Sequence, residues 1–198
     1  MKIKIIVMLC LSILLFNACA VRKNPTIFID LYHSSYQPKF DSAAYQEYKG
    51  KAMIFDSVKI TAGNATMLGY YSTDRNVRYT TNYAVGKMSQ PLESFLWYAL
   101  QKSFARAGLQ ATNDNVAGLP ELHLNFTSLD DGEAKFQLQL LRSRKLLVKK
   151  DFTVTQSLPP TADPALLESR SYAFIDALAT AVLSDPDLKK EMLSSEAK

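Results

Sequence analysis

The stretch "ELHLNFTSLDDGEAKFQLQLLRSRKLLVKKDFTVTQ", residues 121–156, decides the fold of this chain. Apolar and polar residues alternate along it, which is the period of a strand with one buried face. Asp131-Gly132 favours a two-residue hairpin turn, and "RSRK" at 142–145 favours a second turn. Lys150 interrupts the apolar face of the last strand, which indicates a bulge or an edge strand. The stretch therefore predicts a three-stranded antiparallel meander. Its apolar positions are Leu122, Leu124, Phe126, Phe136, Leu138, Leu140, Leu146, Val148, Phe152 and Val154.

Two amphipathic helices flank this meander. The first begins near Ser89, which can cap it, has Pro91 in its first turn and ends at Gly108. The second opens with Asp163 as its cap and Pro164 as its first residue. Each carries one apolar stripe at helical spacing, so each has one face to bury. The stripes are Leu92, Phe95, Leu96, Ala99, Leu100, Ser103 and Ala107 in the first helix, and Leu167, Ser171, Phe174, Ile175, Leu178 and Val182 in the second.

Three more strands are expected before the first helix. Residues 52–62 place Ile54, Val58 and Ile60 on one parity, and residues 67–85 form an aromatic-rich hairpin. The two helical stripes and the apolar face of the meander can all be buried together if both helices lie on one side of the sheet. The predicted fold class is α+β, a two-layer sandwich of a mostly antiparallel sheet with two helices packed on one face.

The N-terminus has the three-part layout of a secretory signal peptide. Lys2 and Lys4 form a short positive region, and an apolar run follows from Ile3 to Phe16. The run is 14 residues long, and a bilayer-spanning helix needs about 20. We therefore expect residues 1–18 to be a cleaved signal peptide.

Cys19 indicates what kind of signal this is. The sequence "FNAC" at residues 16–19 resembles the lipobox of bacterial lipoproteins, with Ala18 as the small residue before the cysteine. The only other cysteine, Cys10, lies within the signal, so the mature chain is expected to hold no disulfide and no thiol-enzyme pair. Acyl chains on Cys19 would attach the protein to a membrane. By resemblance to lipoprotein sorting signals, Ala20 points to the outer membrane, with the domain facing the periplasm.

The rest of the mature chain divides into a polar segment and one domain. Residues 19–51 are expected to be the lipidated N-terminus and a tether, with a short strand possible at 26–32 and a tyrosine-rich stretch that either wraps or links. Residues 52–198 are expected to form a single α+β periplasmic domain.

Catalytic and metal chemistry find little support in the sequence. The chain lacks the common phosphate-binding, nucleophile-elbow, zinc-protease and CxxC motifs, so we predict no enzyme, no cofactor and no metal site. His33 lies in the tether and His123 on the outer parity of a strand, where a solvent-exposed histidine is the favoured interpretation. Asp130 and Asp131 are explained by a turn. The formal charge of +4, or +2 without Lys2 and Lys4, argues against nucleic-acid binding.

Two groups of residues are candidate partner-binding surfaces. Trp97 and Tyr98 lie on the flank and the far side of the first helix, where they either face a partner or contact the tether. The only basic cluster surrounds the last hairpin, which is either a solvated tip or a surface for an anionic partner or lipid headgroups. The cluster consists of Arg142, Arg144, Lys145, Lys149 and Lys150.

The stretch "VRYTTNYAVGKMSQPLESFLWYALQKSFARAGLQ", residues 77–110, resembles the ABC-type transport auxiliary lipoproteins, the PqiC-like group that accompanies MCE-domain lipid transporters. Tyr83, Pro91, Leu92 and Gly108 occupy the places of that family's aromatic strand, helix entry and helix end. The resemblance implies a non-catalytic, outer-membrane-anchored subunit that contacts MCE-domain or ABC transporter subunits and assists lipid or hydrophobic-substrate transport. The alternative is a lipoprotein that aids outer-membrane assembly or regulates a cell-wall synthase.

Overall fold

The computed structural model describes residues 26–61, 67–72, 76–81, 92–129, 132–156 and 163–194. The predicted signal peptide and Cys19 lie outside these ranges. None of the helices within them has the length and apolar character needed to cross a bilayer. The elements are β1 (Thr26–Leu31), the 3-10 helix η1 (Ser42–Tyr48), β2 (Ala52–Ile60), β3 (Met67–Ser72), β4 (Asn76–Thr81), α2 (Leu92–Arg106), β5 (Gln110–Thr112), β6 (Pro120–Leu129), β7 (Glu133–Arg142), β8 (Lys145–Thr155), α3 (Pro164–Leu183) and α4 (Pro186–Leu193).

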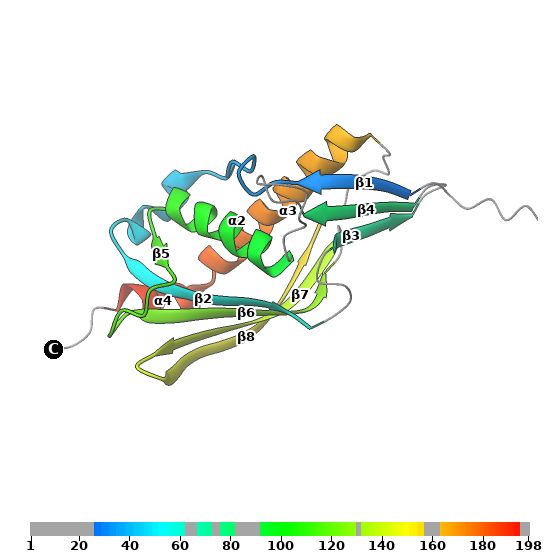
Figure 1. Cartoon of the computed structure of the whole chain (residues 1–198). Helices are drawn as coiled ribbons and strands as arrows, with labels where there is room; N and C mark the ends of the chain where they lie inside the picture. Colours follow the sequence, from blue (N-terminus) through cyan, green and yellow to red (C-terminus); the bar gives the residue numbers. More distant parts are fainter. Residues whose placement is uncertain are drawn as a thin grey trace, which may run out of the picture.

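The predicted fold class is confirmed. Helices α2 and α3 cover one face of a five-stranded sheet (Figure 1), and both apolar stripes are buried there. The N-cap of α3 is Asp163, whose carboxylate accepts from the Ala165 backbone N–H at 2.9 Å, as expected. The buried helix residues that were predicted to meet the sheet include Phe95, Leu96, Leu100, Phe174 and Leu178.

The strands form two sheets, and their pairings are mixed. The five-stranded sheet has the order β5-β2-β6-β7-β8, and a smaller sheet has the order β1-β4-β3. The 121–156 meander is antiparallel as predicted, and so is the β3–β4 hairpin. The pairs β1–β4, β2–β5 and β2–β6 are parallel instead. Helix α2 lies between β2 and β6 in the chain, and a crossover through a helix returns the chain in the same direction.

The predicted inward parity of β2 is wrong over its first half. Its pairing with β6 shifts between Phe55 and Ser57, so Asp56 is the extra residue of a β-bulge. A bulge reverses which residues face the core on its two sides. Phe55 is therefore buried in the core before the bulge and Val58 after it, whereas Ile54 is buried outside the main core cluster.

Helix α2 ends where the sequence predicted. Gly108 follows the helix with a φ of +89°, the left-handed conformation that glycine adopts without strain. A Cβ at this position would also lie 3.1 Å from the Cα of Lys49. The expected start signals, Ser89 and Pro91, lie outside the described residues.

Residues 33–51, here called the wrapping segment, pack against the helices. The side chains of Tyr36, Tyr45 and Tyr48 are buried within the main core. The Tyr48 hydroxyl donates to the Leu183 carbonyl at 2.8 Å, at the end of α3. Of the two alternatives that the sequence left open, this stretch wraps around the domain and belongs to its folded core.

Charged groups of the two helices hold the wrapping segment in place. Lys102 of α2 donates from Nζ to the carbonyl oxygens of His33 at 2.8 Å and Tyr36 at 3.2 Å. Asp176 of α3 accepts from the Tyr36 hydroxyl at 2.6 Å and from the backbone N–H of Lys39. Burial, followed by the hydrogen bond to Asp176, raises the pKa of Tyr36 well above its ordinary value of 10.0. The folded state therefore favours the neutral phenol.

Candidate functional site

Tyr98 is the exposed aromatic side chain of α2, as the helical wheel predicted. The residue is 37% exposed, and its ring stacks on the imidazole of His33 with the ring centres 4.7 Å apart. The same ring meets Trp97 edge-on at 5.0 Å. Tyr98 therefore contacts the wrapping segment and also offers apolar surface to solvent. An aromatic ring held in one orientation loses little further freedom when a partner binds it.

Trp97 is held in place by β2. Its indole Nε1–H donates to the Phe55 carbonyl at 2.7 Å, and its ring lies parallel to that of Phe55 at 5.6 Å. Strand β5 pairs with β2 only as far as Ile54, so this hydrogen bond satisfies a carbonyl just past the end of that pairing. Trp97 is half-buried, and its placement fixes the position of α2 on the sheet.

A hollow of about 300 Å³ opens between α2 and β2. Trp97 and Tyr98 form its aromatic side, while Asp56 and Glu93 bring carboxylates to it. The remaining lining residues are Ser57, Val58, Ser94 and Asn113. The hollow is thus both aromatic and acidic, a combination that suits an ammonium or guanidinium group because ring faces and carboxylates both attract cations.

The basic cluster surrounds the turn between β7 and β8. Ser143 and Arg144 form this turn with φ of 50° and 68°. Arg144, Lys145 and Lys149 are exposed. Arg142 is half-buried, and its Nη2 donates to the Glu191 carbonyl of α4 at 3.0 Å. The hairpin therefore presents three cations to solvent. Arg142, another residue of the predicted cluster, attaches β7 to α4.

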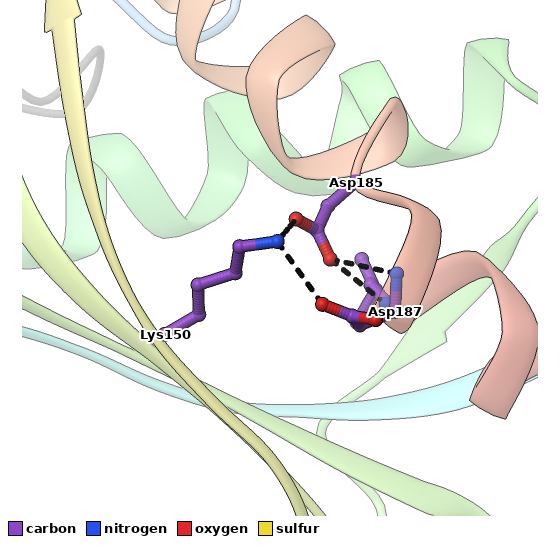
Figure 2. Close-up of polar contacts among 4 residues, drawn as sticks. Lys150, Asp185 and Asp187 are labelled. Carbon is purple, nitrogen blue, oxygen red and sulfur yellow. Dashed lines mark hydrogen bonds and ion pairs between the residues drawn. The ribbon is translucent and has the colours of Figure 1, made fainter.

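Lys150 has a structural partner and points away from the cluster. Of the two predicted explanations for Lys150, a bulge or an edge strand, the edge applies, since β8 is the last strand of the five-stranded sheet. Figure 2 shows the Lys150 ammonium between the carboxylates of Asp185 and Asp187 at the start of α4. These hydrogen bonds, the one to Asp185 first, raise the pKa of Lys150. Asp185 is buried and also caps α4, accepting from the Leu188 N–H at 2.9 Å.

A third cluster forms around His123 on the face of the sheet opposite the helices. His123 Nε2 lies 2.8 Å from Glu121 Oε1, and Nδ1 lies 3.2 Å from Asp56 Oδ2. The hydroxyl of Ser57 lies 3.0 Å from the same Nδ1. Glu121 and His123 are neighbours on one face of β6, which strand alternation alone predicts. Asp56 and Ser57 reach them because of the bulge.

His123 lies on the outer parity of β6, as the alternation predicted, but the alternation gave no sign of Asp56 and Ser57 as its neighbours. The one available signal was a break in the alternation of β2, where Phe55 and Val58 are both apolar and three residues apart. Such a break is typical of a bulge. Asp130 and Asp131, which were assigned to a turn, lie between the end of β6 and the start of β7 and outside the described residues.

Comparisons with known proteins show the fold. No family model matches the chain, and no curated protein matches it. A crystal structure of the protein XCC0632 from Xanthomonas campestris, assigned to the family DUF330, is similar with a TM-score of 0.52 and 11% identity, covering 85% of this chain and 95% of that one. A crystal structure of an uncharacterized protein has a TM-score of 0.45 and 14% identity, covering 80% of this chain and 99% of that one.

Proposed function

We propose that this protein is a lipid-anchored periplasmic accessory subunit of an ABC-type, MCE-associated transport system, and that it acts by contacting other proteins. The resemblance of residues 77–110 to PqiC-like lipoproteins supports the proposal, as does the similarity in fold to a member of DUF330, the family to which PqiC belongs. The site observation that carries it is Tyr98, an exposed aromatic ring fixed by stacking at the edge of a hollow.

The two candidate surfaces contribute different physics to such a contact. Tyr98 offers apolar area, whose burial stabilises a complex with little dependence on salt. Arg144, Lys145 and Lys149 are exposed cations, whose attraction to an acidic partner or to anionic headgroups is screened over about 8–10 Å at physiological ionic strength. The aromatic surface therefore sets affinity, and the basic hairpin sets orientation and the rate of encounter.

The lipid anchor is tested at Cys19. Cells expressing the wild-type chain or Cys19→Ser are labelled with radioactive palmitate and fractionated. We expect label and membrane association in the wild type and neither in the variant, since one acyl chain alone binds only marginally and several are needed for stable attachment. A wild-type chain without label refutes the anchor.

The partner is tested by crosslinking in cells from a photoreactive residue at position 98 or 144. Capture of an MCE-domain or ABC transporter subunit is the expected result. Tyr98→Ala should weaken that capture equally at low and high salt, whereas reversing the charges of Lys145 and Lys149 should weaken it more at low salt. Lys49→Glu, at an exposed lysine of the wrapping segment, is the control for charge reversal.

Two results contradict the proposal, one from this experiment and one from an activity assay on the purified protein. Capture of only an outer-membrane assembly factor or a cell-wall synthase would favour the alternative class of lipoprotein. Efficient turnover of a lipid ester by the purified protein would overturn both interpretations, because neither involves catalysis.

A further inference from the structure

We propose that Asp56, Glu121 and His123 bind a divalent transition-metal ion of the zinc class. One donor atom from each residue lies within 4.8 Å of the other two. The proposal is independent of the partner surface on α2, although Asp56 belongs to both the cluster and the hollow beside Tyr98.

The backbone brings these donors together through the bulge in β2. In the pairing of β2 with β6, Phe55 lies opposite Leu122 and Ser57 opposite His123, so Asp56 is the additional residue between them. Two residues of β2 consequently share His123 as their neighbour. Bulges are frequent beside functional sites because they redirect a side chain from its regular position.

The electrostatics of the cluster favour a bound cation. A neutral imidazole has one N–H and one lone pair, yet both ring nitrogens of His123 face a carboxylate oxygen, at 2.8 and 3.2 Å. Ser57 can donate its proton to Nδ1, but the two carboxylates then remain as a pair of negative charges. Within the described residues neither Asp56 nor Glu121 has a lysine or arginine nitrogen within 4 Å. A metal ion bound to one ring nitrogen and to the carboxylates brings positive charge to this acidic cluster.

The donor set selects the class of ion. One imidazole nitrogen and two carboxylate oxygens suit zinc and similar transition ions, whereas magnesium and calcium prefer oxygen alone. Ligand atoms about 2.0 Å from a tetrahedral zinc lie about 3.3 Å apart. Only one nitrogen of His123 can bind the ion, and each has one carboxylate oxygen near this separation, Glu121 at 2.8 Å from Nε2 or Asp56 at 3.2 Å from Nδ1. The third donor lies within 4.8 Å and has to turn toward the ion. Asp56 and Glu121 are 50% and 34% exposed, so their carboxylates are free to rotate toward an ion.

Three protein ligands leave at least one coordination position open. A water molecule or an incoming ligand can occupy it, because four-coordinate zinc with three protein ligands retains one exchangeable site. The side chains of Asp56, Glu121 and His123 are 50%, 34% and 27% exposed, which gives the ion a direct route from solvent.

The experiment is a calorimetric titration of the full chain, purified in detergent and freed of metal with a chelator, using zinc chloride as the probe. We expect one zinc ion per chain, and at least tenfold weaker binding in both His123→Ala and Asp56→Asn. Asp56→Asn keeps the shape of a half-exposed side chain and therefore guards against loss of folding in the histidine variant. Asp151→Asn, which removes a carboxylate that pairs with Gln137 on the same uncovered face, is the matched control and should bind like the wild type.

Thermal unfolding provides a second readout. Zinc should raise the melting temperature of the wild type and of Asp151→Asn, and magnesium chloride should not, since an ion that binds only the folded state stabilises it. Absence of zinc binding to the wild type overturns the proposal. Zinc binding that weakens less than tenfold in either His123→Ala or Asp56→Asn also overturns it. Such a result would mean that zinc binds elsewhere, for example at His33, the only other histidine in the sequence.

Discussion

Replacing Tyr36 by phenylalanine tests whether the wrapping segment is part of the folded domain. The side chain is fully buried, and its hydroxyl lies 2.6 Å from Asp176 Oδ1 and 2.7 Å from Ser103 Oγ. A hydrogen bond to a charged group contributes about 1.5–3 kcal/mol to stability, and a neutral one about 0.5–1.5. Asp176 keeps its bonds to the Lys39 backbone and Ser103 keeps its bond to the Ala99 carbonyl, so neither is left without a partner.

We therefore expect Tyr36→Phe to lower the free energy of unfolding by about 2–3 kcal/mol. For a domain of this size that corresponds to a fall of about 5–10 °C in the melting temperature. Urea denaturation followed by fluorescence measures the change, and Tyr98→Phe, at an exposed ring, should change stability by less than about 0.5 kcal/mol. If Tyr36→Phe behaves like this control, the segment is a tether and the packing described above does not contribute to folding.

The same substitution has a signature in the pH dependence. Burial raises the pKa of Tyr36, Tyr48 and Tyr172 above 10.0 in the folded state, so each contributes stability that is complete below pH 10 and is lost as the pH rises above it. One such group costs about 1.4 kcal/mol per pH unit once the phenol of the unfolded chain is fully ionised. At pH 10 that phenol is only half ionised, so between pH 10 and 11 the wild type should lose about 1 kcal/mol more stability than Tyr36→Phe. Equal losses would mean that the phenol ionises freely in the folded protein.

Three further substitutions examine the rest of the fold by urea denaturation. Gly108→Ala should destabilise the folded protein more than Gly50→Ala does. Both glycines have a positive φ, but only at position 108 would a Cβ lie against neighbouring backbone, 3.1 Å from the Cα of Lys49. Equal effects would show that only the φ strain matters. Leu100→Ala should lower the free energy of unfolding by about 2–5 kcal/mol, because Leu100 is fully buried. Leu166 is 57% exposed, so Leu166→Ala should change the free energy of unfolding little. A small effect at Leu100 would contradict the packing of α2. Asp185→Ala should lower the free energy of unfolding by at least about 1–2 kcal/mol, the usual effect of losing a helix cap. An unchanged urea midpoint would show that Asp185 does not hold α4 in place.

Local patterns in the sequence determined the elements and their buried faces. The alternation in residues 121–156 predicted the meander, since a strand places every second side chain on one face regardless of its surroundings. The stripes of α2 and α3 likewise identified Leu100 and Phe174 as core residues. Exposure of Tyr98, Lys145 and Lys149 followed from the same periods. Each of these features depends on residues only a few positions apart, so the sequence predicts it without knowledge of the tertiary structure.

Tertiary structure decided the features that join distant parts of the chain. Tyr36 and Asp176 are 140 residues apart, and no local pattern indicates that they share a hydrogen bond. Asp56 meets His123 only because β2 pairs with β6 in a register that contains a bulge. The division into two sheets and the parallel pairing of β2 are also features of the tertiary structure. Backbone hydrogen bonds between strands are satisfied equally well by many partners, so the choice among them depends on which arrangement buries the helices.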